Sequence, residues 1–450
     1  MVNNELSTTR SIHYLGSKLR MLDAVKLAID SVDVFNGTVC DLFSGSGTVS
    51  KYLLQFRDVI AVDIQEYSKV LCEASMSYLE TAVNSDEVVT RILEQTTTQH
   101  ILCSFNNLLL YENSCIEEAM NGNIQNLYEI IESGSLYIYQ QNQSENLSNK
   151  LNNALNECFQ SLKANRLINS VDSMITRYYG GLYFSYKQAV MMDCIAHFAF
   201  EQDGLFKTKI LAALLSTASD VVNTVGKQFA QPLKVRDSHG SAKHSLLHKI
   251  LSDRALDVVE VFRKWLNYYL RAGDVTHNYV AIQSDYVDAL KSLKNSGVTV
   301  VYADPPYTRY HYSRYYHVLE TMCLRDNPEI STTFPNGKGG ISRAIYRTER
   351  HQSPFCIKSQ AEHAFELLFQ GVHELNVPLV LSYSPFEPSK AVTPRLQTMD
   401  QLLDMAKKYY KNVDVISPGT FTHSKLNSTD KNFEANHEAE MLIVCKNRMV

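Results

Sequence analysis

The chain lacks the features that would assign it to several specialised classes of protein. It has no run of 18 or more apolar residues, and its first ten residues (MVNNELSTTR) contain no apolar signal core. We therefore expect a cytoplasmic protein with no membrane segment. The nine cysteines are scattered from Cys40 to Cys445 without a CxxC pair, which argues against a structural zinc site and a disulfide framework. We expect no bound metal, and mostly buried, reduced thiols.

Positive charge is also scarce. The sequence has 43 lysines and arginines against 48 aspartates and glutamates, a net charge of −5. Any nucleic-acid surface must therefore be a local basic patch. The hydrophobic content of 45% is ordinary for a globular protein. At 450 residues, the chain can form one large domain with an insertion, or two to three modest domains.

The most informative stretch is VTVVYADPPY, residues 298–307. Its first six residues are rich in β-branched and aromatic side chains, which predicts a strand buried on both faces of a sheet. Pro305 and Pro306 cannot continue a β-ladder. Asp304 is therefore expected at the carboxyl end of a strand, where open α/β sheets bind their ligands.

This stretch suits chemistry on the amino group of a nucleobase, which is a poor nucleophile because its lone pair is delocalised into the ring. The carboxylate of Asp304 and the carbonyl of Pro305 can accept the two hydrogens of such a group. Tyr307 can stack on a base that has been swung out of its helix. The alternative is an ordinary strand that ends in a proline turn.

A second pattern near the start of the chain predicts a nucleotide-type α/β unit. Thr38–Leu42 reads as a strand, Ser44–Gly47 as a glycine-rich turn and Thr48–Gln55 as a helix. The next strand, residues 58–63, ends in Asp63, at the position where an acid holds a ribose diol. Glycine-rich turns of this kind also serve NAD, FAD or structure alone.

Two flanking segments fit the same kind of site. Residues 13–18 (HYLGSK) precede a predicted helix over residues 19–30 and can face an anion or be a plain helix lead-in. Tyr279–Tyr286 is predicted as a short strand whose final Asp285 and Tyr286 can bind an adenine ring or cap the next helix. The remaining predicted elements are helices 359–375 and 398–410 and strands 377–383, 413–416 and 440–444, the last two as an antiparallel hairpin.

The middle of the chain has a different character. Residues 65–273 show helical periodicity and predict an inserted recognition region, with an Asn/Gln/Ser-rich tract at 140–169 read as loops. Basic residues cluster in two segments, residues 227–249 and residues 327–358. We interpret the second segment as a basic surface loop. Solvated surface is the alternative for both. The insertion leaves residues 1–64 and 274–450 as a discontinuous catalytic domain.

Taken together, TyrLeuGlySerLys, AspLeuPheSerGlySerGly, SerAspTyr and AspProProTyr occur in an order that resembles the D12 class of DNA adenine-N6 methyltransferases, which includes the Dam-like enzymes. The resemblance implies an α/β fold with a Rossmann-like class I methyltransferase sheet, mostly parallel with an antiparallel last strand. It also implies S-adenosylmethionine as cofactor and double-stranded DNA as substrate. We expect a role in restriction-modification or defence, with any endonuclease or other subunit on a separate chain.

The resemblance also implies roles for individual residues. The target-base site would be Asp304, Pro305, Pro306 and Tyr307. The cofactor would be held by Tyr14, Gly16, Lys18, Asp41, Phe43, Gly45, Gly47, Asp63, Asp285 and Tyr286. From these two basic segments, and from the tyrosine- and arginine-rich residues 308–317 whose alternation suits base stacking and phosphate contact or a packed helix, we add six candidate DNA contacts. They are Lys234, Arg236, Arg309, Arg314, Arg343 and Arg347.

Two other functions remain open from the sequence. The same amino chemistry could act on cytosine N4 or on an RNA base. A cofactor-binding regulator that has lost catalysis is a third hypothesis, although every catalytic position is intact. The target sequence is not predicted.

Overall fold

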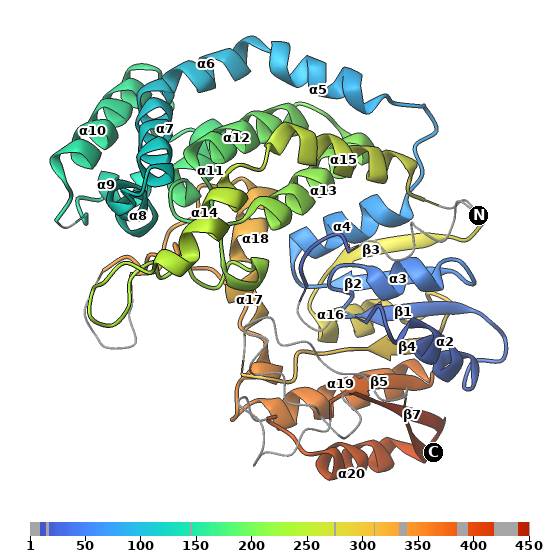
Figure 1. The fold of residues 1–450 in the computed structure, drawn as a ribbon. Coiled ribbons are helices and arrows are strands. Elements are labelled where there is room, and N and C mark those ends of the chain that lie inside the picture. Colours follow the sequence, from blue (N-terminus) through green and yellow to red (C-terminus); the bar gives the residue numbers. More distant parts are fainter. Residues whose placement is uncertain are drawn as a thin grey trace. The chain divides into compact units, whose positions relative to one another are not determined.

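A computed structural model describes residues 10–14, 18–144, 146–273, 276–309, 311–332, 340–384, 395–417 and 440–449. The chain forms two compact units (Figure 1). Unit 1 comprises the described residues of 1–78, 272–313 and 351–450, and unit 2 those of 79–271 and 314–350. None of the described helices is long and apolar enough to cross a membrane.

Unit 1 is built on a seven-stranded sheet with the order β3-β2-β1-β4-β5-β7-β6. The pairs from β3 to β5 are all parallel, and β7 runs antiparallel to both of its neighbours. The predicted α/β fold, with a mostly parallel sheet and an antiparallel hairpin at its end, is confirmed. The strands are β1 (Thr38–Leu42), β2 (Val59–Asp63), β3 (Tyr279–Gln283), β4 (Val298–Ala303), β5 (Leu379–Tyr383), β6 (Tyr410–Ile416) and β7 (Met441–Arg448).

The central strands read as continuous apolar runs because both faces of the sheet are covered. In β1, Val39 belongs to the core cluster of one face and Cys40 to that of the other, as the two-residue period of a strand requires. In β4, Tyr302 belongs to the same cluster as Val39, and Ala303 to the same cluster as Cys40. The cluster that contains Val39 is completed by α2 (Leu22–Asp30), α3 (Thr48–Leu53) and α4 (Glu66–Met76). The cluster that contains Cys40 is completed by α16 (Tyr286–Ser292), α19 (Ala361–Leu375) and α20 (Met399–Tyr409).

Most predicted boundaries in unit 1 agree with the structure to within three residues. β1 matches its predicted bounds, and α2 begins at Leu22 rather than at residue 19. The strand predicted to reach residue 286 ends at Gln283 instead. Asp285 then caps α16, because its Oδ1 accepts the N–H of Val287 at 2.9 Å.

The regular secondary structure in the described part of unit 2 is helical, as predicted for the inserted region. Its boundaries differ from residues 65–273 at two places, since α4 belongs to unit 1 and residues 314–350 belong to unit 2. Its helices are α5 (Ser85–Glu94), α6 (Thr96–Ser104), α7 (Asn106–Met120), α8 (Gln125–Ser133), α9 (Leu136–Gln140), α10 (Asn149–Ala164), α11 (Met174–Tyr179), α12 (Tyr186–Phe200), α13 (Gly204–Val221), α14 (Leu247–Arg254), α15 (Val258–Arg271) and α18 (His317–Leu324); α17 (Tyr312–Tyr315) spans the boundary between the units.

The polar tract at residues 140–169 is not a loop, because α10 occupies most of it. Leu151, Leu155, Cys158 and Leu162 recur at helical spacing and are buried. Ser148 caps the helix by accepting the N–H of Leu151 at 3.2 Å. The composition misled the interpretation, since the asparagines and glutamines occupy the exposed face of an amphipathic helix.

The segment predicted as a basic surface loop, residues 327–358, also differs from that expectation in its described part. Ile330, Ala344 and Ile345 are buried, and Arg347 is only 5% exposed. Residues Pro354–Cys356 form a short 3-10 helix. Several of these residues therefore contribute to the interior of the unit in which they lie.

Candidate active site

A pocket opens in unit 1 beyond the carboxyl ends of β1, β2 and β4. The empty space in and around it is about 1060 Å³, which includes open solvent at its mouth. Four aspartates, one lysine and several aromatic residues line it. Its walls include Tyr14, Lys18, Asp41, Phe43, Gly45, Asp63, Asp285, Tyr286, Tyr302, Asp304, Pro306, Tyr312, Ser313, His351 and Phe355, and Glu440 lies behind Lys18.

The glycine-rich turn forms one wall of this pocket. Phe43, Gly45 and Gly47 all have positive φ, at 116°, 54° and 73°. A Cβ added to Gly45 would lie 2.8 Å from the ring of Tyr14, and one added to Gly47 would lie 2.9 Å from Cys72 Sγ. Both the backbone conformation and the space therefore require glycine at these two positions.

Asp63 holds the turn from the end of β2. Its Oδ2 accepts the N–H of Gly45 at 3.0 Å, and its Oδ1 accepts the N–H of Gln65 at 2.9 Å. Each oxygen keeps a further lone pair for a ligand. Burial raises the pKa of Asp63, whereas the two backbone N–H groups act in the opposite direction.

Asp41, at the end of β1, is more deeply buried. Its Oδ2 accepts a hydrogen bond from Ser50 Oγ at 2.5 Å. Burial raises the pKa of Asp41 to about 7, and the negative charges of Asp304 and Asp63 add to this effect. This carboxyl group therefore titrates near neutral pH.

An aromatic cluster forms another part of the pocket wall. The ring centroid of Phe43 lies 5.6 Å from that of Tyr286 and 5.4 Å from that of Phe355, and the last two are 5.1 Å apart. The hydroxyl of Tyr286 donates to the carbonyl of Ala364 at 3.1 Å, which fixes the ring. Asp285 both caps α16 and lines the pocket, so the two interpretations of SerAspTyr are compatible.

The carboxylate predicted to be catalytic lies at the end of β4 in contact with Lys18. Lys18 Nζ is 2.6 Å from Asp304 Oδ2 and 2.6 Å from Glu440 Oε1. Lys18 and Glu440 are buried, at 5% and 3% exposure, whereas Asp304 is 21% exposed. Ser382 Oγ donates to Glu440 Oε1 at 2.9 Å and holds it in place. The ammonium group of Lys18 bridges these two carboxylates, and Lys18 also lines the pocket. Its predicted role in holding the cofactor stays a prediction.

Burial raises the pKa of Asp304 to about 6, although Lys18 lowers it, and the nearby charge of Glu440 raises it further. Asp304 therefore takes up a proton at higher pH than an exposed aspartate does. The pKa of Lys18 lies well above its usual value because Asp304 and Glu440 outweigh the effect of burial.

The residues after Asp304 form a rigid turn. Pro305 is buried, and Pro306 lines the pocket. The guanidinium carbon of Arg395 lies 4.8 Å from the ring centroid of Tyr307, and the ring of Tyr383 packs edge-on at 5.3 Å. These two contacts orient the ring of Tyr307.

Tyr14 lies beside the same pocket, with its ring centroid 5.6 Å from that of Tyr312. Gly16, also predicted to hold the cofactor, lies outside the described residues. Of the other predicted target-base and cofactor residues, Pro305, Gly47 and Tyr307 do not line the pocket.

The prediction missed several pocket residues. Glu440 was included in a predicted strand but given no role, although an acid before a buried apolar strand could have been noticed. His351 and Phe355 line the pocket from a segment interpreted as a basic loop. The hydroxyl of Tyr302 is buried without a hydrogen-bond partner among the described residues, although this residue lines the pocket.

The six candidate DNA contacts are less uniform. Lys234, Arg309 and Arg314 are exposed. Arg236 pairs with Glu132 at 2.9 Å, and Arg343 donates to the carbonyls of Ile131 and Leu233 at 2.9 and 3.3 Å. Arg347 pairs with both oxygens of Asp326, at 2.8 and 2.6 Å.

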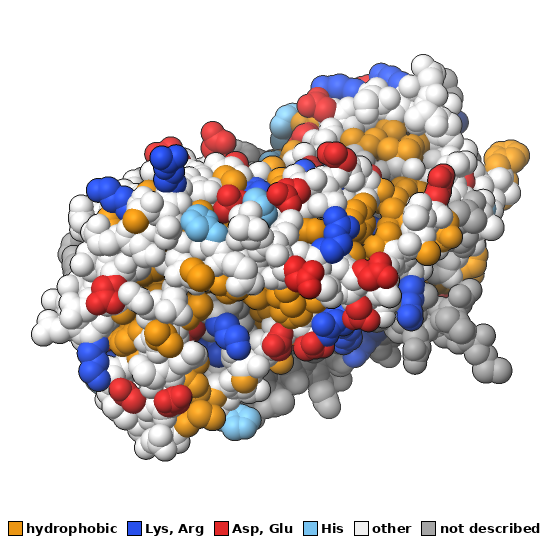
Figure 2. Space-filling model, turned by 90° about the horizontal axis from the view of Figure 1, so that it is seen from above, with side chains coloured by type: hydrophobic (Ala, Val, Ile, Leu, Met, Phe, Trp, Pro, Cys, Tyr) orange, Lys and Arg blue, Asp and Glu red, His pale blue; other side chains and the backbone are white. Residues whose placement is uncertain are grey.

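Arg236, Arg343 and Arg347 therefore have internal roles in unit 2, and contact of the six with DNA stays a prediction. On the face seen in Figure 2, acidic and basic side chains are interspersed with hydrophobic ones rather than separated by sign.

Comparison with known proteins supports the assignment made from the motifs. The family model for D12 class N6 adenine-specific DNA methyltransferases matches residues 14–140. This stretch includes Tyr14, Lys18, the glycine-rich turn and Asp63. The D12-class resemblance is thereby confirmed.

Three relatives have the names of methylases or methyltransferases. Modification methylase LlaI from Lactococcus lactis subsp. lactis is 24% identical over 409 residues, which covers 88% of this chain and 49% of that protein. Type II methyltransferase M.NlaIII from Neisseria lactamica is 23% identical over 363 residues, or 80% of each chain. Type II methyltransferase M.FokI from Planomicrobium okeanokoites is 30% identical over 115 residues, 26% of this chain and 16% of that protein. The chain thus spans about half the length of LlaI.

Proposed function

We propose that this D12-class protein transfers the methyl group of S-adenosylmethionine to N6 of an adenine flipped out of double-stranded DNA. The observation that carries the proposal is the position of Asp304. This carboxylate is tied through Lys18 to Glu440 and lines the same pocket as Asp63 and the glycine-rich turn. A group that accepts hydrogen bonds from a target amino group therefore lies beside a nucleotide-type binding site.

The pocket suits the cofactor in shape and charge. The glycine-rich turn leaves room where a Cβ would collide with Tyr14, and Asp63 retains lone pairs for a ribose diol. The aromatic cluster of Phe43, Tyr286 and Phe355 offers faces for an adenine ring. Carboxylates outnumber cations along the walls, which favours a cationic ligand. When bound there, the cofactor supplies an electrophilic methyl group.

The residues of the chain then act on the target base. The carboxylate of Asp304 and the carbonyl of Pro305 accept the two hydrogens of the amino group and direct its nitrogen lone pair toward the methyl donor. Lys18 holds Asp304 Oδ2, so the carboxylate does not have to reorient during the reaction. Tyr307, oriented by Arg395 and Tyr383, stacks on the flipped base.

The biological context rests on the relatives. Their names describe a modification methylase and type II methyltransferases. We therefore infer that this chain protects host DNA in a restriction-modification system, in which a separate chain would carry the endonuclease.

The test is methyl transfer from labelled S-adenosylmethionine to DNA and RNA by the purified chain. The DNA of an expressing host should then be sequenced for modified bases, which reports the base and its sequence context together. N6-methyladenine at one recurrent sequence is the expected result. Label in N4-methylcytosine or only in RNA would replace the substrate assignment, and absence of transfer with intact cofactor binding would favour a regulator.

A further inference from the structure

Five arginines in the 314–350 part of unit 2 differ in how their charges are neutralised. Arg325 pairs with Asp172, Arg347 pairs with Asp326, and Arg343 donates to two main-chain carbonyls. Arg314 and Arg350 have no carboxylate partner among the described residues. Arg350 Nε donates to the carbonyl of Arg347 at 2.8 Å, which leaves its terminal nitrogens for another acceptor.

The two arginines without acidic partners share one aromatic ring. The guanidinium carbon of Arg350 lies 4.9 Å from the ring centroid of Tyr346, and that of Arg314 lies 5.9 Å from it. The hydroxyl of Tyr346 donates to the carbonyl of Ala230, and its ring packs against His317 at 5.0 Å. The ring is therefore fixed from within unit 2 and can serve as a platform for both cations.

The two guanidinium groups at this ring repel each other, and no carboxylate pairs with either of them among the described residues. Burial lowers the pKa of Arg350, and the positive charge of Arg314 lowers it further, with no carboxylate acting against either effect. His317, which packs against the same ring, supplies no negative charge that would offset the two arginines. Burial lowers its pKa to about 3, so its side chain is neutral at physiological pH. A bound anion would remove this repulsion.

The position of the pair along the chain indicates which anion it would bind. Arg314 directly follows Ser313, and Arg350 directly precedes His351. Ser313 and His351 both line the active-site pocket, and consecutive Cα atoms are about 3.8 Å apart. Each arginine is therefore covalently tied to a residue of the pocket wall.

We propose that Arg314 and Arg350, arranged around Tyr346, bind the phosphates that flank the target nucleotide. Guanidinium groups suit phosphate because their planar N–H donors match its oxygens. Because phosphate contacts carry no base information, the pair would position the strand rather than select its sequence. This inference rests on the proposed function, since it requires DNA as the substrate.

The test is the salt dependence of DNA binding by the full chain, measured with a labelled duplex of mixed sequence in the presence of S-adenosylhomocysteine. Each lost phosphate contact should reduce the slope of log affinity against log salt by about 1. We expect Arg314→Gln and Arg350→Gln each to flatten the slope by about that amount, and Arg314→Lys to keep the slope. Affinity for S-adenosylhomocysteine should be unchanged in all three.

Arg166→Gln is the matched control, because Arg166 is an exposed arginine of unit 2 and its loss removes the same charge. Its slope should equal that of the wild type. Arg314 is exposed, so Arg314→Gln keeps the test valid even if Arg350→Gln folds poorly. Wild-type slopes in both Gln variants, or weaker binding with an unchanged slope, would overturn the phosphate assignment. A wild-type chain that does not bind or methylate DNA would instead refute the proposed function.

Discussion

Lys18 Nζ lies 2.6 Å from Asp304 Oδ2 and equally close to Glu440 Oε1, so one buried ammonium group joins the residue after β4 to the residue before β7. The local charge of this cluster is one negative unit when all three groups are ionised. Lys18 thus keeps Asp304 ionised beside a second carboxylate.

We expect Lys18→Met to shift the pH dependence of methyl transfer. Wild-type kcat/KM should fall below about pH 6, where Asp304 becomes protonated. Without Lys18, which lowers the pKa of Asp304, this acid limb should move to higher pH. Lys26→Met is the control, since Lys26 pairs with Asp30 on the partly exposed side of α2. An unchanged acid limb in Lys18→Met would show that the ion pair does not set the ionisation of Asp304.

The same variant should be less stable. Lys18 and Glu440 are almost fully buried, and removal of one partner of a buried ion pair typically costs about 3–5 kcal/mol. Urea unfolding of Lys18→Met should report a loss of that order, and Lys26→Met should lose less than about 1 kcal/mol. Equal stability of the two variants would contradict the burial of this pair.

Asp304→Ala should retain less than a tenth of wild-type turnover, because the carboxylate acts on the target amino group in the chemical step. Affinity for S-adenosylhomocysteine, measured by calorimetry, should stay within a few-fold of the wild-type value. Asp304→Asn keeps the size of the side chain and serves as the matched variant. Substantial turnover in either variant would remove Asp304 from the chemistry.

Gly45→Val should weaken cofactor binding, because its Cβ would lie 2.8 Å from the Tyr14 ring. Its φ of 54° also strains any non-glycine residue. Gly297→Val separates the two effects, since Gly297 has a φ of 79° with no atom within 4 Å of an added Cβ. Calorimetry should show reduced cofactor affinity for Gly45→Val alone. Normal affinity in a folded Gly45→Val protein would argue against a cofactor turn here.

Tyr302→Phe should not reduce stability, because the Tyr302 hydroxyl is buried without a partner among the described residues, and such a group costs about 1–3 kcal/mol. Tyr383→Phe is the comparison, since the Tyr383 hydroxyl donates to the carbonyl of Gln397 at 2.6 Å. Its loss should cost about 1 kcal/mol. If the Tyr302 hydroxyl bonds a pocket ligand, Tyr302→Phe will also lower cofactor affinity. A large loss of stability would reveal a structural role instead.

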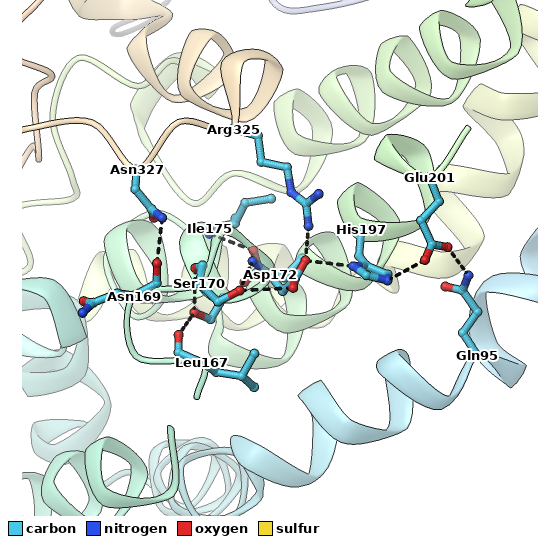
Figure 3. Close-up of polar contacts among 12 residues, drawn as sticks. Gln95, Leu167, Asn169, Ser170, Asp172, Ile175, His197, Glu201, Arg325 and Asn327 are labelled. Carbon is cyan, nitrogen blue, oxygen red and sulfur yellow. Dashed lines mark hydrogen bonds and ion pairs between the residues drawn. The ribbon is translucent and has the colours of Figure 1, made fainter. Parts of the chain in front are cut away.

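We expect the free energy of unfolding to depend on pH because of His197 in unit 2. His197 Nδ1 lies 2.8 Å from Asp172 Oδ1, and its Nε2 lies 3.1 Å from Glu201 (Figure 3). The hydrogen bond to Asp172 raises the pKa of His197. The folded state therefore binds the proton more tightly, and stability should fall as pH rises from about 6.5 through the raised pKa.

Asp172 acts in the opposite direction at low pH. His197 and Arg325 lower its pKa to about 2, so stability should be lost as pH falls from about 4 toward 2. Urea midpoints measured across both ranges should show the two losses, and His197→Gln should lack the upper one. A midpoint that is constant from pH 6 to 8 in the wild type would exclude the His197 contribution.

The sequence was most informative where local pattern determines structure. β1 was predicted to the residue because an apolar run ends at a glycine-rich turn, and Asp304 was placed correctly because two prolines must end β4. The polar composition around residues 149–164 hid the helical spacing of Leu151 and Leu155, which determines the fold of α10. The spacing of a few apolar residues therefore predicts secondary structure better than the overall composition of a segment does.

Contacts between distant segments could not be predicted in this way. Nothing near Lys18 indicates that Glu440 lies beside it, because that contact depends on the order of the strands in the sheet. Arg347 reads as a DNA contact in the sequence, yet Asp326 neutralises it in the structure. The type of a side chain gives its charge but not whether an opposite charge faces it.

The position of β7 between β5 and β6 also constrains how the site can be made during synthesis. Chains emerge from the ribosome amino-terminal end first, so β5 can pair with β4 well before its other neighbour, β7, has been made. Until Met441–Arg448 has emerged, β5 presents an open edge, and Lys18 lacks Glu440. A nascent chain that stops short of β7 would therefore have its glycine-rich turn and Asp304 but not the assembled charge cluster, which forms only after Glu440 and β7 have been made.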